Sequence, residues 1–286
     1  MAGDTGFPQQ DAQSDFSRAR RRQILGKISG KLRREPDDID QILPFDEVID
    51  ALGKTGERVL GTVTIDLDSI VGTVDRGRDF DRSFRPTSHR VRQRWERIAT
   101  AMRRGESMPP IEVYRIGSAH FVKDGHHRVS VARQLGLDRI EARVVGIRTA
   151  MDPGRLDMAD LPLKSHQRLF FERVPLAADL RGRIVLHDGR QFAELAEAVE
   201  AWGFRAMQAA CRYMNRQEVA ALWFRDEYDP VAGLLRDAGL QGDRTETEAY
   251  LAVSSFRYML LRTHSWDEEV IRRIREAIDR RGGMAG

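Results

Sequence analysis

The stretch that most constrains the fold of this chain runs from residue 119 to residue 136 and reads as strand, turn, helix and stop. Phe121 and Val122 favour a strand, and the pair Asp124-Gly125 is typical of a turn. Gly136 suits the left-handed position that follows a helix end. Between the two glycines, apolar residues recur at every third position and predict one apolar helical face: Val129, Ala132 and Leu135. The stretch therefore puts a polar turn at the start of a short helix.

That turn, Asp124-Gly125-His126-His127-Arg128, has the properties of an anion site. Backbone N–H groups in the first turn of a helix have no partner within the helix, and the helix dipole is positive there. Gly125 allows a ligand to approach the backbone closely. Arg128 adds a planar fork of donors that suits phosphate. The alternative is a turn in which Asp124 only caps the helix.

The composition is that of a soluble globular protein, with 41% hydrophobic and 32% charged residues in a chain of 286. This length allows one large domain or two of ordinary size. Because the formal net charge is only +3, any electrostatic grip on nucleic acid has to be local. The one cysteine, Cys211, excludes an internal disulfide and a cysteine metal site. Neither an apolar run of about 18 residues nor a signal peptide is visible, which predicts a cytoplasmic protein that does not enter a membrane.

The segment 58–150 reads as a compact α+β unit. Alternating apolar residues predict a strand over 58–72, and a loop rich in arginine and aspartate follows it. A helix is expected over 91–104. Two more strands, over 111–116 and 140–145, complete the unit, and the strand, turn and short helix of 119–136 lie between them.

A linker is expected over 151–165, where Pro and Gly interrupt the pattern. From 166 to 286 helical periodicity dominates, so a mainly α-helical domain is predicted there. The segment 194–213 faintly resembles a helix-turn-helix with Gly203 at the turn, and packing of its aromatic residues in a core is the alternative. Further expected elements are a strand pair within 174–186 and helices over 166–172, 191–202, 205–213, 215–225, 229–238, 246–262 and 266–280.

The first 57 residues are predicted to be a disordered tail followed by a helical lead-in. Residues 1–17 are rich in Gly, Gln, Asp and Ser and are expected to be disordered. Residues 18–34 read as a basic amphipathic helix that contacts either an anionic partner or, through an apolar stripe, the body of the protein. That stripe consists of Ile24, Leu25, Ile28 and Leu32. A second helix is expected over 37–52.

The order of elements in 58–150, together with the turn Asp124-Gly125-His126-His127-Arg128, resembles the ParB/sulfiredoxin superfamily. The implied fold is α+β: a small ParB/sulfiredoxin-like mixed sheet domain, followed here by the mainly helical domain. In that superfamily a Gly-x-x-Arg turn before a short helix binds nucleotide phosphates. His126 stands where sulfiredoxins carry their reactive cysteine, so their redox chemistry is excluded. In the second domain, 223–231 and 244–251 resemble an uncharacterised helical family to which no activity is attached.

The resemblance implies a set of site residues. The phosphate-binding group comprises the five turn residues Asp124, Gly125, His126, His127 and Arg128, joined by Arg82 and Arg85 from the loop that closes over the nucleotide. A loop carboxylate would hold Mg²⁺ or act as a base, with Asp75, Asp79 and Asp81 as the candidates. A surface loop held by salt bridges is the alternative. The expected ligand is a nucleoside triphosphate, ATP or CTP, with Mg²⁺. No metal site within the protein is expected, because adjacent histidines on a helix point in different directions.

Three functional hypotheses remain open on the sequence. The first is a ParB-like nucleotide-dependent switch, related to chromosome-partitioning proteins, that associates with DNA and forms a homodimer. The second is an ATP- or ADP-dependent small-molecule kinase of the same superfamily, resembling the free-serine kinases. The third is a non-catalytic module whose helical half docks a partner. Two arginine-rich segments, 18–34 and 90–104, are the candidate DNA contacts, and a solvated helix face is the alternative for each.

Overall fold

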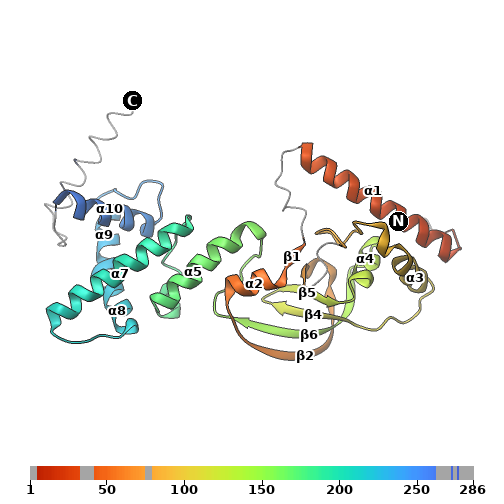
Figure 1. Ribbon diagram of the computed structural model, residues 1–286, viewed down its shortest axis with the longest axis horizontal. Coiled ribbons are helices and arrows are strands. Elements are labelled where there is room, and N and C mark those ends of the chain that lie inside the picture. The colour runs from red at the N-terminus through yellow and green to blue at the C-terminus, as the bar shows by residue number, and fades with distance from the viewer. Residues whose placement is uncertain (1–4, 33–41, 75–78, 262–271, 273–275, 277–286) are drawn as a thin grey trace. The chain divides into compact units, whose positions relative to one another are not determined.

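The computed structural model describes residues 5–32, 42–74, 79–261, 272 and 276, and divides the chain into two compact units. The first unit, Met1–Lys164, contains a mixed six-stranded sheet flanked by helices, and the second, Ser165–Gly286, is helical in its described part (Figure 1). The α+β class predicted from the sequence is confirmed. The division, between Lys164 and Ser165, falls at the end of the segment 151–165 that is expected to be a linker.

The sheet of the first unit has the strand order β1-β3-β5-β4-β6-β2. Strands β1, β3 and β5 run parallel to one another, β4 is antiparallel to β5 and parallel to β6, and β2 is antiparallel to β6. The elements are α1 (Pro8–Leu32), β1 (Leu43–Pro44), α2 (Phe45–Leu52), β2 (Lys54–Asp66), η1 (Leu67–Ser69), β3 (Ile70–Thr73), η2 (His89–Val91), α3 (Arg92–Arg103), β4 (Ile111–Ile116), β5 (Ala119–Asp124), α4 (His126–Leu135), β6 (Arg139–Thr149) and η3 (Met158–Asp160).

The strand predicted over 58–72 is two strands, and this correction shapes the site. β2 ends at Asp66, the single 3₁₀ turn η1 follows, and β3 then enters the sheet at a different position. The Leu67 N–H donates to the Asp138 carbonyl at 2.9 Å, and the Ser69 hydroxyl donates to the Asp66 carbonyl at 2.5 Å. The apolar alternation of Val63, Ile65 and Leu67 loses its phase at Ser69, within η1, before Ile70 resumes the apolar pattern in β3.

Side chains on the two faces of the sheet pack into two separate apolar clusters. On one face Val129 and Ala132 of α4 pack with Val122 and its neighbours, and on the other Phe45 of α2 packs against Phe121. Because successive residues of a strand point to opposite faces, Phe121 and Val122 hold helices on the two sides of β5. The site helix α4 is therefore fixed directly over the strand that precedes it.

The N-terminal region differs from the predicted tail. α1 begins at Pro8, so residues 8–17, expected to be disordered, are helical. Its buried face is Ala12, Phe16 and Ala19, and the Phe16 ring meets Trp95 of α3 edge-on at 5.6 Å. Two aspartates complete this face: Asp15 is fully buried and bonds Arg103 at 2.6 Å, and Asp11 is buried beside it. The polar composition of 1–17 does not indicate this buried face, because the helix has only about one buried apolar residue per turn.

The described half of the apolar stripe expected over 18–34 is exposed. Ile24 and Leu25 are exposed, while the side chains of Ile28 and Leu32 lie outside the described part. Of the helix expected over 37–52, residues 42–52 are described, and α2 occupies only Phe45–Leu52. Pro44 precedes α2, and its fixed backbone angle suits the start of a helix.

The second unit contains α5 (Leu161–Arg173), which crosses the division, and α6 (Ala178–Arg181), α7 (Gly189–Ala210), α8 (Arg216–Trp223), the π-helical turn η4 (Phe224–Tyr228), α9 (Asp229–Asp237) and α10 (Glu246–Leu261). The strand pair expected within 174–186 is not formed. The helix expected over 266–280 lies outside the described residues, apart from residues 272 and 276. No helix of the described part is long and apolar enough to span a membrane.

The helix-turn-helix considered for 194–213 is wrong, because α7 continues through Gly203 without a turn. Gly203 is buried, and a Cβ there would collide with Val219 of α8. The glycine is thus explained by the close approach of two helices, which glycine alone permits at this point.

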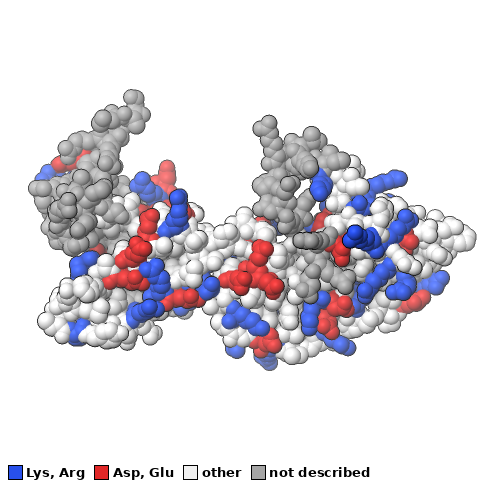
Figure 2. Space-filling model, viewed as in Figure 1, with Lys and Arg blue, Asp and Glu red and all other residues white. Residues whose placement is uncertain are grey.

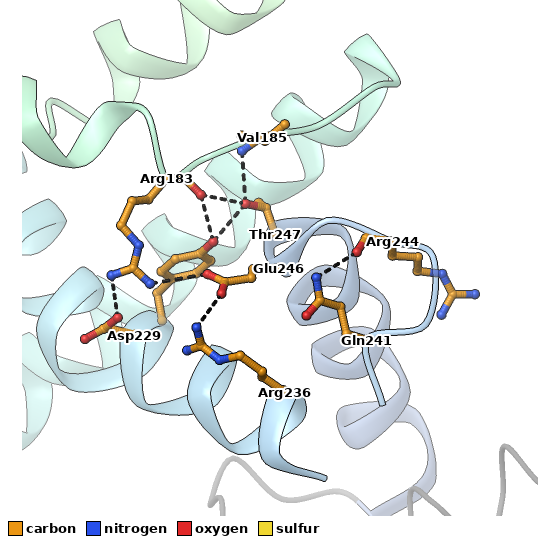
Figure 3. A network of polar contacts seen from close by, with 9 residues as sticks. Arg183, Val185, Asp229, Arg236, Gln241, Arg244, Glu246 and Thr247 are labelled. Carbon is orange, nitrogen blue, oxygen red and sulfur yellow. Dashed lines mark hydrogen bonds and ion pairs between the residues drawn. The ribbon is translucent and has the colours of Figure 1, made fainter. Parts of the chain in front are cut away.

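A buried polar network ties the second unit together (Figure 3). The Thr247 hydroxyl accepts from the Val185 N–H at 3.1 Å and lies 2.8 Å from the Tyr228 hydroxyl, which donates to the Arg183 carbonyl at 3.1 Å. Around it, the Arg183 guanidinium pairs with Asp229 and Glu246, and Glu246 also pairs with Arg236. The segment 223–231 is therefore part of the scaffold that joins α9 and α10 to the segment around Arg183 and Val185, which precedes α7.

Candidate functional site

The polar turn lies where two parallel strands end. β3 and β5 are paired neighbours, with Thr73 beside Val122, so their carboxyl ends lie at the same edge of the sheet. β5 ends at Asp124, Gly125 adopts the left-handed conformation, and α4 begins at His126 with no side chain capping its N-terminus. The strand, the turn, the helix and the stop at Gly136 are confirmed. An uncapped helix start at the carboxyl edge of parallel strands is a favourable place for an anion.

Gly125 is required by the local geometry. Its φ of 103° lies in the region that favours glycine, and a Cβ at this position would lie 2.8 Å from the Cβ of Ile111. The turn is thus pressed against the start of β4. This contact fixes the direction in which the first N–H groups of α4 point.

Arg128, the expected phosphate clamp, is engaged by the protein itself. Its Nη1 donates to the carbonyl oxygens of Pro109 and Pro110, at 2.8 Å to the latter, and its Nη2 pairs with the Asp124 carboxylate at 2.6 Å. The side chain is only 11% exposed. Arg128 therefore braces the turn against the segment that leads into β4. A phosphate that reached its Nη2 would have to replace Asp124, whose carboxylate is 61% exposed.

His126 and His127 are both buried and face the loop after β3. The Nε2 of His126 lies 2.6 Å from the Thr73 hydroxyl, at the end of β3. The Phe80 ring stacks on the His126 ring at 6.3 Å and meets the His127 ring edge-on at 5.3 Å. The described residues contain no group of His, Cys, Asp and Glu suited to a metal ion. The two histidines thus connect the turn to the loop.

The loop 79–87 is organised by Asp81, one of the three candidate catalytic carboxylates. This buried carboxylate accepts from the N–H groups of Ser83 and Arg85 at 3.0 and 2.9 Å and from the Arg85 Nε at 2.8 Å. Burial raises the pKa of Asp81, and the bonds from Arg85 oppose that rise. All these contacts are local, so Asp81 caps a tight loop. Phe84, at its centre, has a φ of 57°, a conformation that side chains rarely adopt.

The other predicted loop residues do not converge on the turn through the contacts described. The second Arg85 contact, from Nη1, reaches the carbonyl of Arg22 in α1 at 3.1 Å, and Arg82 pairs with Asp157 at 3.5 Å. The Asp79 carbonyl accepts from the Thr87 N–H at 2.9 Å. Asp75 lies outside the described residues. It is the aromatic rings of the loop, more than its charges, that reach the turn.

Four residues of this assembly had no assigned role in the sequence analysis: Thr73, Phe80, Phe84 and Arg133. Arg133 donates from Nη2 to the carbonyls of Leu67 and Ile70 at 2.7 and 2.8 Å, and its guanidinium lies 5.1 Å from the Phe84 ring centre. Burial lowers the pKa of Arg133. Two phenylalanines in an otherwise charged loop were the available signal for a buried core, whereas the contacts of Arg133 leave no pattern in the sequence.

A cavity of about 530 Å³ lies on the far side of the loop. It is lined by α1, η1, the loop and the C-terminal half of α4, including Arg22, Arg85 and Arg133. The Phe84 ring lies 6.4 Å from the His126 ring of the turn, and Phe84 also lines this cavity. Phe84 therefore lies between the turn and the cavity.

Comparison of the chain with family models and with curated proteins finds no match.

Proposed function

We propose that the turn 124–128 binds the phosphate groups of a nucleotide and that the chain acts as a ParB-like nucleotide-dependent switch. The observation that carries the proposal is the start of α4: a ten-residue helix that begins without a side-chain cap, after a left-handed Gly125, at the carboxyl edge of β3 and β5. The dipole and the first N–H groups of such a helix attract negative charge. The expected ligand is ATP or CTP, which brings Mg²⁺ with its phosphates.

The contacts around the turn support a switch. A ligand at the first turn of α4 acts on His126 and His127, which touch Thr73 and Phe80. Phe80 belongs to the same tight loop as Arg85, and Arg85 holds α1 through the carbonyl of Arg22. Movement at the turn is thereby passed to the loop and from the loop to α1. A packed loop of this kind has discrete arrangements rather than a continuum, as a switch requires.

The kinase alternative draws no support from Asp81, because its carboxylate is used by the loop itself. Asp124 is a better candidate for Mg²⁺, since it is largely exposed and lies at the turn. Its carboxylate would repel a metal-free triphosphate and would attract the same triphosphate with Mg²⁺ bound. This difference provides a test that does not depend on turnover.

The experiment measures ATP and CTP binding by titration calorimetry, with and without Mg²⁺, for the wild type, Asp124→Asn and Asp138→Asn. Asp138 is an exposed carboxylate of the same unit at the opposite end of α4, so it serves as the matched control. Without Mg²⁺, removal of the Asp124 charge is expected to tighten binding about fivefold, equivalent to about 1 kcal/mol at close range. With Mg²⁺ this gain is expected to vanish or reverse.

Binding of neither nucleotide by the wild type would overturn the proposal. Equal effects of the two asparagine variants would also overturn it, because the ligand would then not lie at the turn. Incubation with Mg²⁺ and a panel of hydroxyl compounds separates the chemistries. Phosphate release to water, or binding without turnover, supports a switch, whereas transfer to a hydroxyl compound favours the kinase.

A further inference from the structure

Positive charge is concentrated in one layer of the first unit. α1 carries six Lys or Arg against two Asp, and the segment 89–106 carries six Arg against two Glu. These 43 residues hold an excess of eight positive charges, while the whole chain has +3, so the remainder is net negative. On the face shown in Figure 2, Lys and Arg side chains gather over the part that contains α1 and α3. The modest total charge therefore hides a strongly basic layer.

Within this layer, three of the arginines are already engaged in contacts with the protein. Arg103 pairs with buried Asp15, Arg20 donates to the Pro86 carbonyl, and Arg92 pairs with Glu96. Arg94 and Arg97 are exposed, and among the described residues neither forms an ion pair with a carboxylate. Arg103 joins the two helices through Asp15, whereas the exposed Arg92 is paired within α3. Arg94 and Arg97 are therefore available at the surface.

The outward arginines line a groove of about 540 Å³ beside α3, at the start of α1. Arg94, Arg97 and Arg104 share one face of the helix and extend over about 15 Å at 1.5 Å per residue. Gln9, Gln93 and Thr100 add neutral hydrogen-bonding groups to the lining, and Ala101 adds a small apolar one. The two glutamates of the groove are each held by an arginine, Glu96 by Arg92 at 2.6 Å and Glu106 by Arg104 at 3.7 Å.

We propose that this groove, with the arginine stripe Arg94, Arg97 and Arg104, binds the phosphate backbone of double-stranded nucleic acid without reading its bases. Arginines and uncharged donors in a row suit successive phosphates and sugars. The described lining contains no aromatic residue, and stacking on aromatic residues is the usual means of holding single strands. A membrane surface would require large apolar side chains among the basic ones, and the exposed Ile24 and Leu25 of α1 are not part of the groove.

Two further observations point the same way. The helix-turn-helix candidate in the second unit is one continuous helix, so that segment offers no base-reading element of this kind. The Phe16–Trp95 contact and the Asp15–Arg103 pair fix α1 on α3, so the stripe is held on a rigid support. The proposal does not rest on nucleotide binding at the turn, because no residue of the turn lines the groove.

The test measures fluorescence anisotropy of a labelled duplex of about 20 base pairs and arbitrary sequence, titrated with the full chain at several salt concentrations. The test variant replaces the stripe: Arg94→Gln, Arg97→Gln and Arg104→Gln. The control variant removes the same charge from exposed arginines of the second unit: Arg190→Gln, Arg225→Gln and Arg244→Gln. The stripe variant is expected to bind at least tenfold more weakly. Its plot of log affinity against log salt concentration is expected to be less steep by about 2–3, because each phosphate contact contributes about 0.9 to the slope. The control variant is expected to stay within twofold of the wild type.

Three results would overturn the proposal: no duplex binding by the wild type at low salt, equal losses in the two variants, or a single strand of the same length bound more tightly than the duplex. Anionic lipid vesicles, titrated in parallel, should bind no more tightly than neutral ones. An unchanged melting temperature shows that the stripe variant is folded, because all three arginines are exposed. Nucleotide titrations of the same variant should match the wild type, which separates failure at this surface from failure at the turn.

Discussion

Thr247 in the second unit and Asp124 in the first are both polar residues at the start of a helix, yet they belong to opposite kinds of arrangement. Thr247 is fully buried, and its hydroxyl is shared among the Val185 N–H, the Arg183 carbonyl and the Tyr228 hydroxyl. Asp124 is largely exposed, pairs with Arg128 and leaves the start of α4 without a side-chain cap. In the first arrangement, a closed network, the polar groups bond to one another and stabilise the unit. The second leaves the first N–H groups of α4 without a side-chain acceptor, as an anion site requires.

The largest effect is expected from a substitution that distorts the turn itself. Gly125→Ala forces an alanine to a φ of 103° and presses its Cβ against Ile111. Backbone strain and overpacking together are expected to lower the free energy of unfolding of the first unit by about 3 kcal/mol, measured by urea denaturation. Gly136→Ala is the control, since Gly136 also has a positive φ, 75°, but has open space around it. Equal losses in the two variants would mean that the contact with Ile111 carries no strain.

Removal of the central hydroxyl of the closed network is expected to cost slightly less. Thr247→Val leaves the Val185 N–H without its acceptor and should lower the free energy of unfolding by about 2 kcal/mol. Hydrogen exchange read by mass spectrometry should locate the loss in α9 and α10 and leave the turn 124–128 unchanged. Tyr228→Phe removes the neighbouring hydroxyl, so the two substitutions should combine to less than their sum. Strict additivity would indicate that the two hydroxyls act independently.

A buried histidine of the first unit makes its stability depend on pH. Burial lowers the pKa of His120 to about 4, with Arg115 nearby adding to the effect, and its Nδ1 lies 2.9 Å from the Ser69 hydroxyl. The folded pKa is below the ordinary value of 6.5, so the folded state binds fewer protons than the unfolded state. Stability is therefore complete above pH 6.5 and is lost as the pH falls toward 4, by about 2–3 kcal/mol at 1.36 kcal/mol per pH unit. His120→Gln should remove this part of the pH dependence in denaturation at pH 7.0, 5.5 and 4.5. An unaltered pH profile in the variant would assign the acid sensitivity to other groups.

The smallest effect on stability is expected at the exposed Asp124 of the turn, where function should instead change. Asp124→Asn removes an ion pair whose carboxylate is 61% exposed, and such pairs contribute about 0–1 kcal/mol. Thermal unfolding should therefore shift by only a few degrees, while the metal-free nucleotide affinity shifts as proposed. A stability loss as large as that of Thr247→Val would show that Asp124 belongs to the scaffold, and the contrast between the two units would fail.

Local patterns account for much of what the sequence analysis predicted correctly. The strand-turn-helix at 119–136 follows from β-forming residues, a turn pair and a three-residue apolar period, all of which act over a few positions. The α+β class follows from the same patterns repeated along the chain. The break at η1, the continuous helix through Gly203 and the buried face of α1 depend on partners far away in sequence, such as Asp138, Val219 and Trp95. No local pattern reports on those partners.

The same division holds within the candidate site. The sequence by itself determined that a glycine turn opens a short helix after a strand, because backbone preferences and side-chain periodicity suffice for that. Only the tertiary structure decided that Arg128 braces the turn through the carbonyls before β4, that Asp81 caps its own loop, and that the rings of Phe80 and Phe84 reach the histidines. A charged side chain bonds to whichever acceptor the fold brings near. Its chemistry is fixed by the sequence, while its partner depends on how strands and loops that are distant in the chain come together.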